Sequence, residues 1–137
     1  MAREYTIRWL LTRLSGGAIV SSTMQGFLRW QWSDYPAKHR SRANLLIHIV
    51  AVPLFQVGTL FLVYGALSRA AGVMALSVVW LAVSLVMQGR GHKLEAEPPT
   101  PFGGAGDAVR RIMAEQWITF PRFVLSGGWY RNLTGAR

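Results

Sequence analysis

The chain contains no cysteine among its 137 residues. This absence excludes disulfide bonds, thiolate-bound zinc, iron–sulfur clusters and thiol nucleophiles. Any metal must therefore be held by histidine, carboxylate or amide oxygen ligands. Histidine is itself scarce, since the chain has only three, at His39, His48 and His92.

Charge is also scarce, above all negative charge. Charged residues make up 15% of the chain and hydrophobic residues 51%, whereas about a quarter of the residues of a soluble domain are charged. The balance of 15 Lys and Arg against 6 Asp and Glu gives a net charge of +9. The length predicts one domain over residues 1–137, and the composition indicates a membrane protein. A strongly basic chain can bind nucleic acid, anionic lipid or an acidic substrate.

Two long runs of the sequence carry no charge at all. Residues 45–67 would rise roughly 34 Å as a helix and residues 70–87 roughly 27 Å, against a hydrocarbon core of about 30 Å. The connection between them is only Ser68 and Arg69, so the two helices must be antiparallel. The sequence predicts an all-α integral membrane protein with a transmembrane hairpin over about 45–67 and 70–88. Pro53 should kink the first helix.

The placement of the basic residues predicts the orientation of this hairpin. Seven precede Leu45, seven follow Met87 and only Arg69 lies in the connection. By the positive-inside rule both termini should face the cytoplasm, at the inner membrane of a bacterium or the endoplasmic reticulum of a eukaryote. The same placement explains the net charge without nucleic acid, and no nucleic-acid-binding motif occurs, so no such partner is expected.

The segments that flank the hairpin mix aromatic, apolar and basic residues. Residues 3–14 and 18–32 are typical of amphipathic helices, either at a lipid interface or packed on the rest of the chain. A further amphipathic helix is predicted over 107–117, extending toward Leu125 with a break at Pro121. The tail, residues 127–137, is expected to be poorly ordered.

The predicted hairpin brings all three histidines to one membrane face. His39 precedes the first span, His48 lies about one turn inside it, and His92 follows the second span. A histidine within an apolar run is costly unless it is paired or coordinated. One such histidine alone is more simply a capping or interfacial residue. Three together, with no thiolate, favour a metal site for Fe(II), Zn(II) or Mn(II).

Two polar residues are spaced to take part in this site. Asn44 lies four residues before His48, on the same helix face, and Glu95 lies three residues after His92. Asn44 could orient His48 or a bound oxygen. Glu95 could be a fourth ligand, or could accept a hydrogen bond from an imidazole N–H.

These residues form a pattern that resembles a known family. The pattern is Tyr35-x3-His39-x4-Asn44-x3-His48-x4-Pro53, followed by Gln88-x2-Gly91-His92. It is similar to the Mpo-like family, membrane proteins typified by the fungal 2-hydroxy fatty acid dioxygenase, over about residues 35–121.

The resemblance implies a small multi-helix membrane enzyme with histidine-bound Fe(II). It would use O2 to shorten a 2-hydroxy fatty acid by one carbon, in an α-oxidation. By this likeness His39, His48 and His92 correspond to the metal-site histidines and Asn44 to the intervening asparagine. The family usually has glutamate four residues after its second-motif histidine, where this chain has Ala96 between Glu95 and Glu97.

The resulting hypothesis is an Fe(II)-dependent dioxygenase whose substrates are O2 and a 2-hydroxy fatty acid. The carboxylate and hydroxyl of the acid would chelate the metal, and the acyl chain would lie in lipid. Headgroup-level cations could attract the carboxylate, although each also serves as an ordinary topology-setting charge: Arg40, Arg42, Arg90 and Lys93.

Two alternatives remain open at the level of sequence. The first is a zinc-dependent lipid hydrolase that acts through an activated water. The second is a non-enzymatic membrane hairpin that assembles with itself or with a partner. Small residues cluster near the hairpin tip and would allow close helix approach in such an oligomer: Gly65, Ala66, Ala70, Ala71, Gly72 and Ala75.

Overall fold

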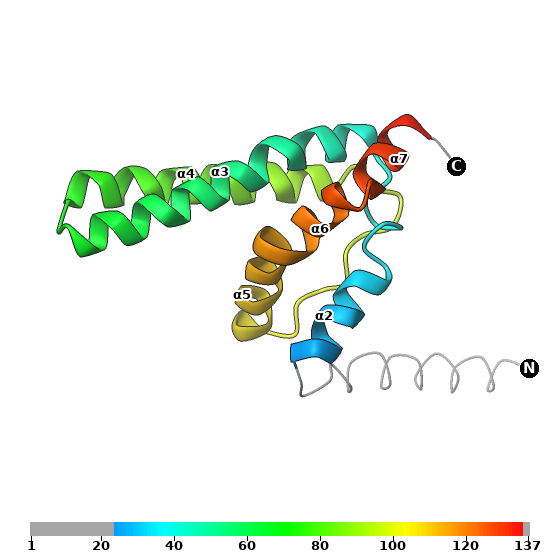
Figure 1. The fold of residues 1–137 in the computed structure, drawn as a ribbon, viewed down its shortest axis with the longest axis horizontal. Helices are drawn as coiled ribbons and strands as arrows, with labels where there is room; N and C mark the ends of the chain where they lie inside the picture. Colours follow the sequence, from blue (N-terminus) through cyan, green and yellow to red (C-terminus); the bar gives the residue numbers. More distant parts are fainter. Residues whose placement is uncertain (1–23, 136–137) are drawn as a thin grey trace, which may run out of the picture.

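The computed structural model describes residues 24–135, and within this range it contains helices, turns and loops but no strand (Figure 1). The prediction of an all-α fold is confirmed for this part of the chain. The elements, in order, are α2 (Met24–Ser33), α3 (Arg42–Leu67), α4 (Ala71–His92), α5 (Ala105–Ala114), the π-helix η1 (Glu115–Thr119), α6 (Phe120–Leu125) and α7 (Gly128–Thr134).

The two longest helices lie side by side and are joined by a tight turn at one end (Figure 1). Ser41 caps α3, because its hydroxyl accepts a hydrogen bond from the backbone N–H of Asn44. The turn between the helices places Arg69 at φ 56°, in the left-handed region. Each helix is a few residues longer at the histidine-bearing end than the sequence predicts, so His92 is the last residue of α4.

Both helices are long and apolar enough to cross a membrane, with mean hydropathy of 2.2 for α3 and 2.0 for α4 in their most apolar windows. Only 28% and 17% of those windows are buried in the protein. Large apolar side chains are exposed on both helices, among them Val50, Leu60, Leu76 and Val79. A core helix of a soluble domain would bury such residues, so these surfaces suit a lipid environment.

Near the end of α3 and α4 that is distant from the turn, η1 and α7 contact α3, whereas α2 and α5 contact η1 and extend away from the pair (Figure 1). Their buried apolar cluster joins α3 to α6 and to the loop before α3, and it consists of Tyr35, Leu45, Val52, Phe120 and Phe123. Two arginines attach α2 to the C-terminal helices, with Arg110 lying 4.2 Å from the ring centre of Phe27 and Arg122 4.2 Å from that of Trp32.

The chain runs from α5 through η1 into α6 without the break that we predict at Pro121. Instead the helix widens, and the backbone N–H of Phe120 bonds to the carbonyl of Glu115, five residues back. Proline has no N–H to donate, and the wider turn accommodates this loss without ending the helix. Single π turns of this kind often occur at functional sites.

The expectation of a poorly ordered tail is wrong for residues 128–134, which form α7. The Trp129 indole N–H donates to the carbonyl of Leu45 at 3.0 Å. The Asn132 amide donates to the carbonyls of Pro36, at 2.8 Å, and His39, at 2.6 Å. These long-range bonds fix the segment, and no local sequence pattern reveals them. The predicted helix over 3–14 lies outside the described residues, and only the end of the one over 18–32 is described, as α2.

Gly91 provides a test of the packing between α3 and α4. A Cβ atom at this position would collide with Oδ1 of Asn44, which is fully buried. We expect Gly91→Ala to destabilise the protein by about 1–3 kcal/mol, the usual cost of overpacking. Thermal unfolding in detergent would measure the loss.

Gly89→Ala is the matched control, because a Cβ at Gly89 meets nothing within 4 Å. This variant should be as stable as the original chain or slightly more so, since alanine favours helix. Equal midpoints for both variants would contradict the close approach of Asn44 to Gly91.

Candidate metal centre

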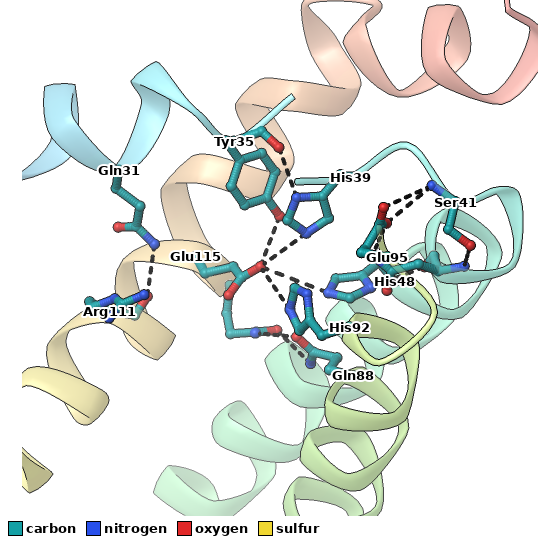
Figure 2. A network of polar contacts seen from close by, with 12 residues as sticks. Gln31, Tyr35, His39, Ser41, His48, Gln88, His92, Glu95, Arg111 and Glu115 are labelled. Atoms are coloured by element: carbon teal, nitrogen blue, oxygen red, sulfur yellow. Dashed lines mark hydrogen bonds and ion pairs between the residues drawn. The ribbon is translucent and has the colours of Figure 1, made fainter. Parts of the chain in front are cut away.

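Four side chains from four parts of the chain meet at one point (Figure 2). His39 lies in the loop before α3, His48 one to two turns inside α3, His92 at the end of α4, and Glu115 at the start of η1. Each offers one ligand atom, and these atoms all lie within 4.8 Å of one another. The structure therefore brings together the three histidines that the sequence singles out, and it adds a carboxylate.

The three imidazoles face a single oxygen atom. The Nε2 atoms of His39, His48 and His92 lie 3.6, 3.8 and 3.9 Å from Oε1 of Glu115. In a tetrahedral site with bonds of about 2.0–2.1 Å, the ligand atoms are about 3.4 Å apart. The three nitrogen–oxygen separations are only slightly longer, and no two of the four ligand atoms lie more than 4.8 Å apart, so the group is close in size to such a site.

Backbone carbonyls fix the tautomers of two of the imidazoles. Nδ1 of His39 lies 2.9 Å from the carbonyl oxygen of Tyr35, and Nδ1 of His48 lies 3.0 Å from that of Asn44. A carbonyl only accepts hydrogen bonds, so Nδ1 carries the proton in each ring. In the neutral ring Nε2 then presents a lone pair toward Glu115, which is how metal-binding histidines are commonly oriented.

Burial makes these free nitrogens costly. Nε2 of His39 and of His48 are buried, and neither has a hydrogen-bond partner within residues 24–135. A buried polar atom without a partner costs about 1–3 kcal/mol. A cation placed between the imidazoles and the carboxylate would satisfy both atoms, and three imidazole nitrogens with one carboxylate oxygen suit Fe(II), Zn(II) or Mn(II).

The carboxylate of Glu115 is held in its ionised form. Burial alone would raise its pKa, but the nearby imidazoles of His39, His48 and His92 favour the charged form and lower the pKa to about 2. The hydroxyl of Tyr35 donates to the same oxygen, Oε1, at 2.9 Å. Burial, the charge of Glu115 and this hydrogen bond raise the pKa of Tyr35 well above its usual value, so the phenol stays a donor.

The structure places Asn44 and Glu95 beside this group rather than in it. Glu95 accepts hydrogen bonds from the Asn44 amide at 2.5 Å and from the backbone N–H groups of Arg40 and Ser41, both at 3.0 Å. It thus braces the start of α3. Asn44 contacts His48 through its backbone carbonyl, whereas its side chain binds Glu95.

Glu115 is the site residue that sequence reasoning missed. It lies beyond a loop rich in proline and glycine, and no spacing rule connects it to His92. One signal was available, because Glu115 is among only 6 acidic residues of the chain and sits on a predicted amphipathic helix. The position of its carboxylate depends on the π turn, which the sequence did not predict.

A pocket of about 490 Å³ opens onto the four-residue group. Its wall includes His39, His92 and Glu115, while His48 lies behind them and is fully buried. Large apolar and aromatic side chains line much of it: Trp30, Leu85, Phe102 and Ile112. Such a cavity fits an amphiphilic small molecule better than a simple ion.

Three cationic side chains also line this pocket, and they differ in their partners. Lys38 pairs with Asp34 at 2.5 Å and bonds to Thr100 at 2.9 Å. Arg111 donates to two carbonyls of the loop between α4 and α5. The ammonium of Lys93 has no hydrogen bond or ion pair within residues 24–135. The other predicted cations do not line the pocket: Arg40, Arg42 and Arg90.

Comparison with known proteins finds no matching family model, no similar curated protein and no similar solved structure. The resemblance of the sequence pattern to the Mpo-like family therefore stays a prediction.

Substitution of the proposed ligands should remove bound metal. In Glu115→Gln and His48→Gln the side chains stay polar but lose a charged oxygen or an imidazole nitrogen. We expect each to weaken metal binding by more than about tenfold, because removing even an outer partner of a ligand costs about 10–100-fold. Elemental analysis of purified protein would measure the content. Glu97→Gln is the control, since Glu97 is exposed and lies outside the four-residue group. Equal metal content in all three variants would show that the group is not a metal site.

Proposed function

We propose that this protein is a membrane-embedded, Fe(II)-dependent dioxygenase that shortens 2-hydroxy fatty acids by one carbon. The observation that carries the proposal is the group of His39, His48, His92 and Glu115 at the end of a pocket with an apolar wall. The sequence pattern that resembles the Mpo-like family supports it, because the same three histidines form that pattern.

The four residues of this group would hold the iron. When bound, Fe(II) supplies the one-electron chemistry by which O2 reacts with an organic substrate, which zinc cannot do. The donor set is also compatible with zinc, so the lipid hydrolase remains the second candidate. The identity of the bound metal separates the two.

The proposed reaction balances without an external reductant. A 2-hydroxy acid and one O2 give the acid one carbon shorter, CO2 and water. The bond between C1 and C2 breaks, both carbons are oxidised, and O2 takes up the electrons. A pocket that binds only the acid and O2 is therefore sufficient.

Residues of the pocket suit a long-chain acid. Lys93 follows His92 directly, and its ammonium, which has no partner among residues 24–135, can attract the carboxylate to the metal end of the pocket. Trp30, Leu85 and Ile112 offer apolar surface to the first part of the acyl chain. Tyr35 would keep Oε1 of Glu115 oriented toward the imidazoles by its hydrogen bond.

The proposed membrane placement follows from the exposed surface and the charges. In lipid, the apolar faces of α3 and α4 would be solvated, and the metal centre would lie near the headgroups at the cytoplasmic face. A fatty acid could then reach the pocket from the bilayer. A purely structural hairpin offers no reason to bury imidazole nitrogens without partners, which disfavours the non-enzymatic alternative.

Oxygen uptake would test the activity. Protein purified in detergent and loaded with Fe(II) should consume O2 when 2-hydroxy fatty acid is added, in equal amount to the acid consumed. Mass spectrometry should find the acid one carbon shorter. Zinc-loaded protein is the control and should be inactive. Iron binding without O2 uptake or product would contradict the dioxygenase, and ester cleavage by the zinc form would favour the hydrolase.

Lys93→Ala should raise KM for the acid by about tenfold, the value of one charge-assisted hydrogen bond, with little change in kcat. Arg90→Ala is the matched control, because Arg90 is a nearby exposed cation of α4 that does not line the pocket. It should leave KM unchanged. Equal effects of the two substitutions would indicate general attraction of anions and would remove Lys93 from substrate binding.

A further inference from the structure

Gln116 lies next to the carboxylate of Glu115 and is hydrogen-bonded by two amide side chains, those of the buried Gln88 and the partly buried Gln56. It is the second residue of η1, directly after Glu115, and it is only 1% exposed. Its side chain forms a reciprocal pair with Gln88 of α4, with N–O distances of 3.1 and 2.7 Å. Its backbone carbonyl accepts a hydrogen bond from the Gln56 amide of α3 at 2.7 Å.

Pro121 explains why the carbonyl of Gln116 needs an outside donor. The N–H of Phe120 donates to the carbonyl of Glu115, five residues back. By the same spacing, the carbonyl of Gln116 would accept a hydrogen bond from the N–H of residue 121. That residue is proline and has no N–H. Gln56 replaces the missing donor, and in doing so it ties the widened turn to α3.

The amides of Gln56 and Gln88 come from α3 and α4, the helices that carry His48 and His92. Gln88 lies one turn before His92 on α4, and Gln56 lies about two turns after His48 on α3. Gln88 is itself anchored, because its amide also donates to Ser84 at 3.0 Å and Ser84 donates to the carbonyl of Ala51. The turn that carries Glu115 is therefore hydrogen-bonded to α3 and α4, and Figure 2 shows Gln88 close to Glu115 and the imidazoles.

We infer that Gln56 and Gln88 are positioning residues that set the place of the Glu115 carboxylate among the three imidazoles. They do not touch the ligand atoms and act through Gln116 and the π turn. The inference rests on the proposed metal centre. It assigns to these amides the role that outer hydrogen-bond partners have for metal ligands.

Co(II) titration of the full chain in detergent tests this role. Gln88→Met and Gln56→Met keep length and packing but remove the amide, and each should weaken Co(II) binding by about tenfold. The visible absorption of bound Co(II), which reports ligand geometry, should change as well. Ser77→Ala is the matched control, because Ser77 is buried on α4 and, in the part of the chain that the structure describes, its hydroxyl bonds only to Val73 of its own helix. It should bind Co(II) like the original chain.

A second arm separates positioning from general support of the fold. In the Glu115→Gln background, the Gln88 or Gln56 substitution should cause little further loss of Co(II) affinity, because the ligand it positions is already gone. The inference would be overturned if the losses of Co(II) affinity from the two substitutions add fully, or if the Gln88 and Gln56 variants bind Co(II) like the original chain. Either result would leave the metal centre intact. Failure of the original chain to bind Co(II), Fe(II) or Zn(II) would overturn the proposed function and the inference together. Helical circular dichroism would show that each variant is folded.

Discussion

The convergence of three imidazoles on one carboxylate is the constraint on which the rest of the structure depends. It requires buried, polar groups at the base of two very apolar helices. Such groups are costly unless they are paired or coordinated. The carbonyl of Tyr35 accepts a hydrogen bond from Nδ1 of His39, and the carbonyl of Asn44 accepts one from Nδ1 of His48. In each ring the other nitrogen then faces Glu115.

The base of the hairpin is accordingly a region of long-range polar bonds, while the far half is held by apolar packing. The Trp129 indole, the Asn132 amide and the Glu95 carboxylate all bind backbone groups of the loop before α3 or of its first turns. These groups fix the loop that carries His39. A loop residue can serve as a ligand only if its backbone is restrained in this way, so the C-terminal helix α7 contributes to the site without touching it.

The sequence was sufficient for the parts of the fold that depend on local composition. Uncharged runs predicted α3 and α4 within a few residues, and a two-residue connection predicted that they return antiparallel. The meeting of His39, His48 and His92 followed from this topology alone. The carboxylate did not, because its position depends on how α5 and α6 fold back across the proline-rich loop. Spacing from His92 favours Glu95 as the carboxylate, yet its bonds to Asn44 and Ser41 direct it to the start of α3.

At Pro121 the sequence correctly locates an irregularity in the helix but predicts the wrong kind. Proline in a helix removes a hydrogen bond, and the expected result is a break or kink. Here the partly buried amide of Gln56 on α3 supplies the missing donor, and the helix widens by one residue and continues. The wide turn lets Glu115 face the imidazoles while the adjacent Gln116 faces Gln88. A break would have left the carboxylate free to move, whereas a π turn fixed at both its backbone and its side chain holds it. The irregularity thus follows from Pro121, and it lies beside a cluster of possible ligand atoms, at the kind of place where single π turns often occur.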